Sequence, residues 1–453
     1  MKYDVIVCGA GPSGINAAIS ASRNNMKVLL IESTSLIGGN PINALVEPWM
    51  TFHKGNKQVV RGIASEIVER LVQSGNSLGY IKDPLNFCET ITPINVEGAK
   101  ALFFDYIKEE HIDLLLHAII FDVILENNQV KAVKVMTKGG ELTFEAKVFI
   151  DTTGDGDVSK LAGADYIFGR EKDNLAQPMT MIFQVANVDI ERLKEEIRNN
   201  KEDFIIRDDY DYKYLGISGF FKKIERAKEN NEFDLPRDRV LLFEEVIPNC
   251  VSVNMTRVQK LRGTNPFELT EAEIEGRIQI KKAFKFLKKY IPGFEHSYMF
   301  ATPVKIGIRE TRHIIGDYVL SMDDIALRTK FEDSIALSGF PIDIHSPDGS
   351  ALEIPNIDLN EPISIPMRSL IVKGIENLLV AGRCVSATHE ACASIRVTPT
   401  AMALGEAAGV LSIPASVNCN LFYKRLYVHH LKVFRTFYLV ESLYHVQSSY
   451  HDW

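Results

Sequence analysis

The chain lacks the features that define several protein classes. In its 453 residues there is no low-complexity tract, and no apolar run reaches the roughly 20 residues that a membrane-spanning helix needs. A basic leader followed by an apolar segment and a cleavage site is also missing, so we expect no signal peptide and no transmembrane segment. The net charge of −8 leaves no excess of basic residues, which argues against a nucleic-acid partner.

Cysteine is scarce and shows no paired spacing. No C-x-x-C occurs among the six cysteines, which are Cys8, Cys88, Cys250, Cys384, Cys392 and Cys419. Scattered thiols of this kind are typical of a reducing cytoplasm, and a disulfide reductase would carry closely paired redox cysteines. We therefore predict a cytoplasmic protein, with two or three domains because the chain is too long for one ordinary core.

The first 33 residues carry a dinucleotide-binding pattern. An apolar run, Val5–Cys8, precedes the G-x-G-x-x-G of Gly9, Gly11 and Gly14. Small apolar residues at helical spacing follow, then a second apolar run that ends at Glu32, about 20 residues after the glycines. The order strand, glycines, helix, strand and acid predicts a dinucleotide site, and a merely structural turn is the alternative.

Each part of this pattern has a physical role. Gly9 permits a tight turn, Gly11 lets the backbone approach a pyrophosphate, and Gly14 allows close packing of helix and strand. The helix N-terminus offers backbone N–H groups and a positive dipole end to the phosphates. The Glu32 carboxylate can accept both ribose hydroxyls of an adenosine and would repel a 2′-phosphate.

Three further segments favour FAD over NAD. A glycine pair, Gly38-Gly39, follows the acid and would let a loop lie along the cofactor. Residues 148–157 read as a strand that runs into a Gly/Asp turn, and residues 378–381 read as a late buried strand followed by Gly382-Arg383. A simple NAD-linked dehydrogenase, the rival interpretation, needs none of these elements.

The chain resembles the FAD-dependent oxidoreductase family of the glutathione-reductase-like flavoprotein superfamily. The resemblance rests on GIRETRHIIGDY (307–318) and AGRCVSATHEACASIRVTPTAMALGEAAG (381–409) and covers roughly residues 3–412. It implies an α/β fold in which a Rossmann-like, glutathione-reductase-type FAD-binding domain is built from both chain ends. Residues 1–165 and 361–415 would form that domain, and 166–360 an inserted mixed α/β substrate domain.

The resemblance also implies a set of cofactor-lining residues and non-covalent FAD. They are Gly9, Gly11, Gly14, Glu32, Gly38, Gly39, Gly154, Asp155, Gly382 and Arg383. Many related flavoproteins carry an acid at the position where this chain has Arg383. An arginine at this position fits this branch of the family. A covalent flavin on His53 is a minor alternative.

Two more contacts to the cofactor are expected from predicted elements. A helix over residues 96–108, capped by Asn95, is predicted to precede a strand meander. Such a meander commonly covers the adenine, so backbone atoms of Phe121–Val123, including Val123, are candidate cofactor contacts. A second helix, predicted to begin at Pro399 with Thr398 as its cap, has small residues such as Ala401 at its start. Its dipole would favour an anionic reduced flavin.

Arg396, His389 and Arg309 are the candidate catalytic residues. Arg396 precedes the late helix and can contact the flavin face or hold a substrate anion, with a scaffold salt bridge as the alternative. His389 is a candidate proton donor or acceptor, or a loop residue that positions the cofactor. Arg309, with Glu310 and Arg312, would recognise substrate or form a mutually paired structural cluster.

We therefore expect a FAD-dependent oxidoreductase that moves a hydride between a small organic substrate and flavin N5. The alternative is a flavoprotein with structural FAD or a net non-redox, hydratase- or isomerase-type reaction. No second G-x-G-x-x-G occurs, so a reductase would need an external electron donor or acceptor. The aromatic and His-rich tail, 416–453, matches no metal-ligand motif; it has no catalytic role or makes a contact with an oligomer partner or membrane surface.

Overall fold

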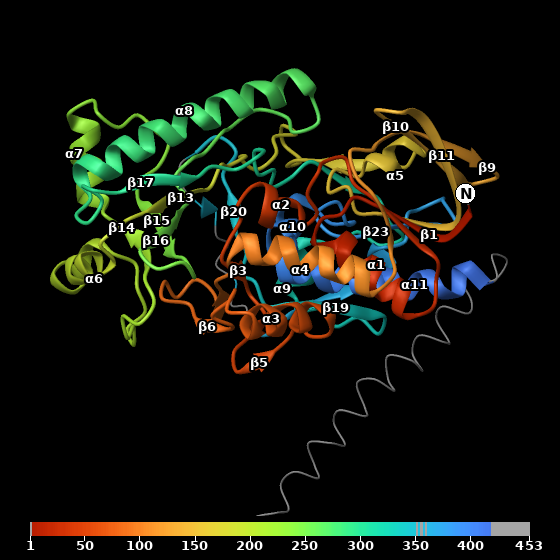
Figure 1. The fold of residues 1–453 in the computed structure, drawn as a ribbon, viewed down its shortest axis with the longest axis horizontal. Coiled ribbons are helices and arrows are strands. Elements are labelled where there is room, and N and C mark those ends of the chain that lie inside the picture. Colours follow the sequence, from red (N-terminus) through yellow and green to blue (C-terminus); the bar gives the residue numbers. More distant parts are fainter. Residues whose placement is uncertain (1, 350–351, 354–356, 358–359, 418–453) are drawn as a thin grey trace, which may run out of the picture.

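The computed structural model of the protein describes residues 2–349, 352–353, 357 and 360–417. Two large sheets lie toward opposite ends of the molecule, as Figure 1 shows. One holds strands from both ends of the chain, and the other holds strands from the middle. The predicted mixed α/β fold with a parallel sheet is confirmed.

The first sheet has a parallel half and an antiparallel extension. Its order is β8-β2-β1-β11-β10-β9, and β23 pairs with the last part of β11. The strands are β1 (Lys2–Cys8), β2 (Val28–Ile31), β8 (Asp113–Leu115), β9 (Ile119–Glu126), β10 (Gln129–Thr137), β11 (Gly140–Asp151) and β23 (Leu378–Val380). Cys8 is in register with both Ile31 and Asp151, so three parallel strands end at one edge. The strands predicted at Val5–Cys8 and 378–381 are confirmed.

Two long helices pack together over this sheet. α1 (Pro12–Arg23) lies against α11 (Thr398–Val417), which comes from the other end of the described chain (Figure 1). Gly405 permits the close approach, because a Cβ there would lie 2.0 Å from the Ser13 carbonyl oxygen. The predicted late helix is present but already includes Thr398, which is therefore its first residue and not its cap.

The remaining elements of this half are short, apart from two helices. α4 (Val96–Glu109) begins as predicted, with the Asn95 side chain accepting from the Glu97 N–H at 3.1 Å. The others are α2 (Gly39–Asn43), β3 (Trp49–Met50), β4 (His53–Lys54), β5 (Lys57–Gln58), α3 (Ile63–Gln73), β6 (Ile81–Lys82), β7 (Thr90–Thr92), α5 (Asp157–Leu161), β12 (Tyr166–Phe168), β18 (Arg312–Ile314), α9 (Met322–Ala326), β19 (Ser334–Ser338), β20 (Ile344–His345), β21 (Leu352–Glu353), β22 (Ile363–Pro366), the 3-10 helix η2 (Met367–Ser369) and α10 (His389–Ile395).

The second sheet is antiparallel and is formed by residues from the middle of the chain. Its order is β14-β15-β16-β13-β17, and α8 runs along it in Figure 1. The elements are β13 (Phe183–Ala186), α6 (Ile190–Asn199), η1 (Lys201–Asp203), β14 (Gly216–Gly219), α7 (Phe221–Glu229), β15 (Val240–Glu244), β16 (Cys250–Val253), α8 (Pro266–Tyr290) and β17 (Tyr298–Ala301). Its helices α6 and α7 are rich in charged residues.

Each sheet has its own apolar core. Val5, Val148 and Leu379 belong to the first core, and Phe183, Leu242 and Phe286 to the second. Leu320, Ile325, Ala336, Ile342 and Ile344 lie in the predicted insert yet pack into the first core. The division at 165 and 361 stays a prediction, and the tail prediction lies outside the described residues from 418 onward.

Candidate functional site

A cavity of about 660 Å³ lies where the parallel strands end. Its wall includes the loops after β1, β2, β11 and β23 on one side and strands of the second sheet on the other. Crevices beyond the carboxyl ends of parallel strands are the usual binding sites of α/β folds.

The loop after β1 has the shape that the glycine pattern predicts. Gly9 has φ +99°, and a Cβ there would lie 2.6 Å from the Thr152 carbonyl oxygen. A Cβ on Gly14 would lie 1.8 Å from the Gly9 carbonyl oxygen, so only glycine fits. Gly11 and Ser13 line the cavity, and no side chain caps the N-terminus of α1. This end of the cavity therefore offers backbone N–H groups and a helix dipole to an anion.

Glu32 lies at the end of β2 and lines the same cavity. One carboxylate oxygen accepts from the Ala10 N–H at 2.9 Å, and the other accepts from the N–H and hydroxyl of Thr34, both at 2.9 Å. This second oxygen also accepts from the Ser33 hydroxyl at 3.1 Å, so the oxygen that accepts from Ala10 is the one with a lone pair left for a ribose hydroxyl. The carboxylate thus also ties the loop after β2 to the loop after β1.

The glycine pair bends the next loop back onto the first. The Gly38 N–H donates to the Ala10 carbonyl oxygen at 2.7 Å, and Gly38 has φ +113°. Gly39 lines the cavity, and a Cβ there would lie 2.9 Å from Gly11 Cα. Gly38 and Gly14 shape this wall from behind, since neither lines the cavity itself.

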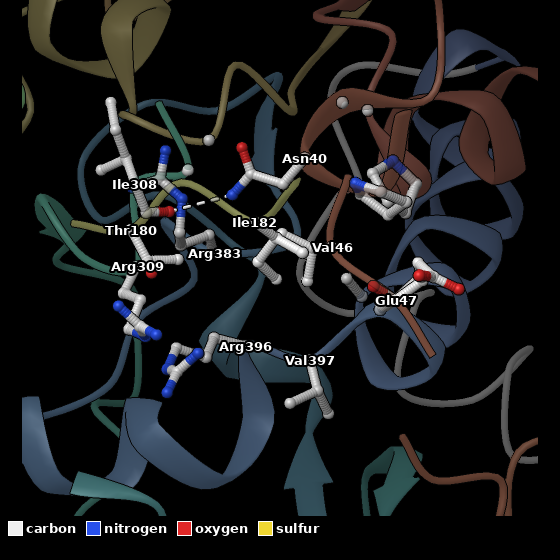
Figure 2. Close-up of a pocket in the computed structure, with 18 of the residues that line it drawn as sticks. Asn40, Val46, Glu47, Thr180, Ile182, Ile308, Arg309, Arg383, Arg396 and Val397 are labelled. Atoms are coloured by element: carbon white, nitrogen blue, oxygen red, sulfur yellow. Dashed lines mark hydrogen bonds between the residues drawn. The ribbon is translucent and has the colours of Figure 1, made fainter. Parts of the chain in front are cut away.

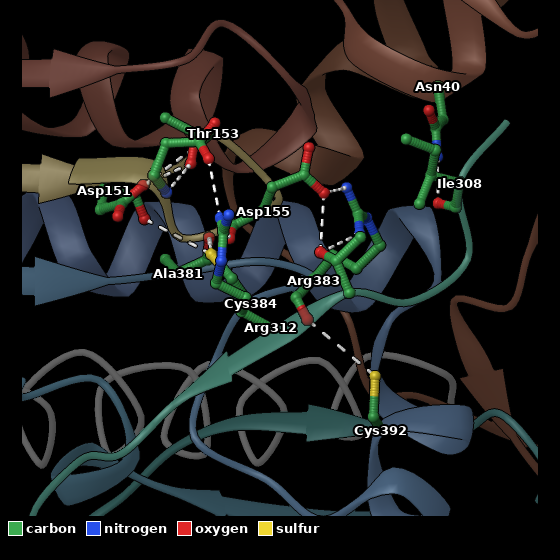
Figure 3. A network of polar contacts seen from close by, with 12 residues as sticks. Asn40, Asp151, Thr153, Asp155, Ile308, Arg312, Ala381, Arg383, Cys384 and Cys392 are labelled. Carbon is green, nitrogen blue, oxygen red and sulfur yellow. Dashed lines mark hydrogen bonds and ion pairs between the residues drawn. The ribbon is translucent and has the colours of Figure 1, made fainter. Parts of the chain in front are cut away.

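The turn after β11 meets the turn after β23 in a charged network, shown in Figure 3. Arg383 donates to Asp155 Oδ1 at 2.6 Å and to the Thr311 hydroxyl at 3.0 Å, and Thr311 donates to Asp155 at 2.7 Å. Burial would raise the pKa of Asp155, but the charge of Arg383 and these hydrogen bonds lower it overall. Gly154, Gly382 and both charged groups line the cavity.

The N-terminus of α11 closes this part of the wall. Thr398 and Ala401 line the cavity, and the Ser13 hydroxyl donates to the Ala401 carbonyl oxygen at 2.7 Å. The first turns of α1 and α11 are therefore held side by side at the cavity. Both dipoles present their positive ends to it.

Arg309 and Arg396 lie together at the other end, where Figure 2 shows their guanidinium groups side by side. Arg396 forms an ion pair with Asp343 at 3.1 Å, and Arg309 donates to the Pro178 carbonyl oxygen. Burial and the positive charge of Arg396 lower the pKa of Arg309. Burial opposes ionisation of Asp343, yet His345 and the two arginines hold its pKa below the usual range.

Two buried arginines of the second sheet also reach this end, and sequence reasoning missed both. Arg237 precedes β15 and Arg257 follows β16, and each lines the cavity. Burial and the charge of Arg257 lower the pKa of Arg237 to about 10. Neither arginine belongs to a recognisable motif in the sequence, and arginines without a motif are common on protein surfaces.

A buried pair of glutamic acids is a second feature that the sequence did not reveal. Glu47 lines the cavity, and its side chain contacts Glu245 at the end of β15. Gln184 donates to Glu245 Oε1 at 2.7 Å. Burial and the mutual repulsion of the two carboxyl groups raise the pKa of Glu47 well above its usual value. The pair therefore holds a proton at a pH where an exposed carboxyl group has lost it.

Several predicted site residues lie away from the cavity. Val123 faces neither the cavity nor the glycine loops, and Ile119 and Ile120 of the same strand line the cavity instead. His389 is buried, 4% exposed, and its Nδ1 contacts Glu310 at 2.8 Å behind the wall. His53 contacts the Thr90 hydroxyl and does not line the cavity, which gives no support to a covalent flavin there.

The three charged residues of GIRETR, all within the described part of the chain, form no ion pair with one another. Arg309 faces the cavity, Glu310 contacts His313 and His389, and Arg312 forms an ion pair with Asp157 at 2.8 Å. Burial would raise the pKa of Glu310, but hydrogen bonds from the two histidines lower it to about 2. The segment before Arg312 is irregular and the arginine itself begins β18, so the two arginines do not share a helix face.

Within the described residues, no helix is long and apolar enough to cross a bilayer, and no group of three or more metal-ligating side chains forms.

The family model described as FAD dependent oxidoreductase matches residues 4–423. The chain therefore belongs to this family. FAD is the cofactor, and non-covalent binding is typical of such flavoproteins. The uncapped α1, the close glycine loops and the Glu32 carboxylate fit a dinucleotide.

The chain spans less than half the length of the curated reductases it matches, and most of the length of two solved structures. The chain is 24% identical over 179 residues to digeranylgeranylglycerophospholipid reductase 1 of Methanococcoides burtonii, which is 36% of this chain and 41% of that protein. A geranylgeranyl bacteriochlorophyll reductase-like structure from Thermoplasma acidophilum matches at 13% identity and a TM-score of 0.47, covering 96% of this chain and 83% of its own. The L-proline dehydrogenase of P. horikoshii matches at 12% identity and a TM-score of 0.42, covering 91% and 94%.

Proposed function

We propose that the protein moves a hydride between a small organic substrate and FAD, with both bound in the one cavity. The observation that carries this proposal is the composition of the cavity wall. Dinucleotide-binding loops form one end, and buried arginines and a carboxylic acid pair form the other. FAD, when bound, supplies the redox chemistry, and the chain binds, orients and protonates.

The cofactor side of the proposal assigns a role to each loop. The backbone of Gly9, Gly11 and the first turn of α1 would hold the pyrophosphate, and Glu32 the adenosine ribose. The remaining residues proposed to line the cofactor are Gly39, Gly154, Asp155, Gly382, Arg383 and Ala401, with Gly14 and Gly38 shaping the loops. The antiparallel β9-β10 extension and the late strand β23 support a glutathione-reductase-type arrangement.

The substrate side rests on Arg396 and Arg309. Both are half-buried and line the wall, and guanidinium groups hold carboxylates with paired hydrogen bonds. His389 would act as a positioning residue, because it contacts Glu310 and so holds the segment that carries Arg309. The Glu47–Glu245 pair is placed to hold the proton that accompanies a hydride.

The electron partner and the location are also part of the proposal. The sequence has no second G-x-G-x-x-G, which supports an external electron donor or acceptor. The five described cysteines are all free and buried, which supports a cytoplasmic location.

The test is the visible spectrum of the purified protein, followed by anaerobic titration with a chemical reductant. We expect a yellow protein that releases FAD on denaturation and bleaches and recovers reversibly. A flavin that binds but cannot be reduced reversibly would favour the structural or non-redox alternative. A protein that stays colourless with added FAD would refute both.

A further inference from the structure

Three arginines from separate segments meet at the end of the cavity away from the glycine loops. Arg237 precedes β15, Arg309 lies in the loop before β18, and Arg396 follows α10. We call these three residues the arginine cluster. Each of the three lines the cavity, and Figure 2 shows Arg309 beside Arg396.

Arg237 is buried, Arg309 and Arg396 are half-buried, and the hydrogen-bonding capacity of the cluster is not used up. Arg237 is 7% exposed, and the Arg396 side chain is 12% exposed. In the part of the chain that the structure describes, the Nε atoms of both are buried without a hydrogen-bond partner. A buried N–H without a partner costs free energy, so the protein alone leaves the hydrogen-bonding capacity of both side chains incomplete.

The charges of the cluster are also not balanced. Asp343 forms an ion pair with Arg396. Among the described residues, no carboxylate forms an ion pair with Arg237 or Arg309, which donate to the carbonyl oxygens of Asn254 and Pro178. Buried cations without counter-ions are strongly destabilising. The lowered pKa values of Arg237 and Arg309 reflect the same burial and repulsion.

The other polar groups nearby do not supply the missing charge. Asp238 is paired with Arg239 at 2.9 Å. Burial lowers the pKa of His345 to about 3, so this ring is neutral at pH 7 and adds no cation. Arg257 and Lys305 line the cavity as well and raise the positive potential further. Two guanidinium groups are thus left for an anionic ligand.

We propose that the arginine cluster binds a small organic dianion as the substrate of the hydride transfer. This inference rests on the proposed function, because it places that substrate in the cavity shared with FAD. Arginine forks match carboxylates and phosphates, and one negative charge is needed for each of the two unpaired guanidinium groups. A substrate with an ammonium group at this end would be repelled.

The first experiment measures ligand selectivity of the full-length, FAD-loaded protein by calorimetry at constant ionic strength. The probes are succinate, butyrate, neutral 1,4-butanediol and glycerol phosphate. We expect a dianion to bind roughly tenfold or more tightly than butyrate, and butanediol not to bind measurably. Tighter binding of succinate or of glycerol phosphate identifies which anionic group the cluster takes. Equal affinity for succinate and butyrate, with no preference for the phosphate ester, would overturn the inference.

The second experiment uses variants. Arg309→Met and Arg237→Met keep most of the side-chain volume, and each is expected to weaken binding of the preferred dianion roughly 10- to 100-fold. Arg192→Met is the control for loss of one cation, because its side chain is 53% exposed and lies outside the cavity. Unchanged dianion affinity in both cavity variants would contradict the proposal. The selectivity of the unaltered protein does not depend on whether the variants fold.

Flavin content and bleaching by dithionite distinguish a failure of the dianion site from a failure of FAD binding. If FAD binds and is reduced but no dianion preference exists, the inference fails and the proposed function stands. If the protein takes up no FAD, the proposed function fails, and the same calorimetry on the flavin-free protein still tests the cluster.

Discussion

Two glycines at the start of α1 have different surroundings: Gly11 directly precedes the helix, and Gly14 lies in its first turn. A Cβ on Gly11 would meet nothing closer than Gly39 Cα at 3.9 Å, whereas a Cβ on Gly14 would collide with the Gly9 carbonyl oxygen. Gly11 has φ −75°, which alanine adopts without strain. The fold therefore requires Gly14, and Gly11 is required only by what binds in the cavity.

We predict that Gly11→Ala and Gly14→Ala separate binding from stability. Gly11→Ala should weaken FAD binding roughly tenfold or more while leaving the melting temperature of the flavin-free protein unchanged. Gly14→Ala should lower the stability of the flavin-free protein by about 1–3 kcal/mol or more, because overpacking forces the backbone to move. Thermal melting and FAD titration measure the two effects. Equal effects of both substitutions on the flavin-free protein would contradict this reading.

The Glu47–Glu245 pair makes stability depend on pH. Because the folded-state pKa of Glu47 is raised, the folded protein binds more protons than the unfolded chain above a pH of about 4.5. Its stability should therefore fall as pH rises from there through the folded-state pKa.

Glu47→Gln should reduce this pH dependence. The amide keeps the shape and can donate to Glu245, so the melting temperature should fall less between about pH 5 and about pH 8.5 than in the unaltered protein. Glu225→Gln, on the exposed face of α7, is the control. A pH profile of Glu47→Gln that matches the unaltered protein would show that the pair does not share a proton.

At the scale of elements, α1 and α11 join the two ends of the described chain. The hydroxyl groups of Ser13 and Ser20 donate to backbone oxygens of α11, at 2.7 and 2.9 Å. Gly405 lies where the two backbones touch. The wall that presents two helix N-termini to the cavity thus depends on one small residue.

Gly405→Ala is expected to cost about 1–3 kcal/mol of stability through overpacking against Ser13. Because α11 would shift away from α1, FAD affinity should fall as well. Ala403→Ser, at a half-buried position of the same helix, serves as the control. Urea unfolding and FAD titration of both variants provide the measurement, and a neutral Gly405→Ala would refute the close packing.

The Asp155–Arg383 pair links the turns after β11 and β23. Removing one partner leaves a largely buried charge, so Arg383→Gln should destabilise the protein by about 3 kcal/mol. The double variant with Asp155→Asn should be more stable than the sum of the two single losses predicts, since it leaves no unpaired charge. The free energies of unfolding of the four proteins, measured in urea, complete this double-mutant cycle. Additive losses would show that the two groups are independent.

At the scale of the molecule, the cavity is lined by residues from both cores. A ligand that binds only the folded protein stabilises it by about 2.7 kcal/mol at a concentration 100 times its dissociation constant. FAD should therefore raise the melting temperature and slow amide exchange both in the loop after β1 and in the β15–β16 region. Protection confined to the glycine loops would show that the second sheet does not share the site.

The sequence by itself determined the local part of this protein. The strand, glycine turn, helix and acid over residues 3–33 are adjacent in the chain, and their backbone geometry follows from short-range sterics and hydrogen bonds. The Asn95 cap and the strand before Gly382 were predicted for the same reason. Thr398 was misassigned as a cap because the boundary of a helix depends on what its first turn packs against.

Only the tertiary structure decided which distant residues meet in the cavity. Arg237 and Glu47 gave no usable signal, since their neighbours at the site lie far away in the sequence. Val123 and His389 carry plausible residue types, yet packing turns them away and brings Ile120 to the wall instead. The physical reason is that the burial of a side chain and the charges around it depend on residues that folding brings together, so no short segment determines them.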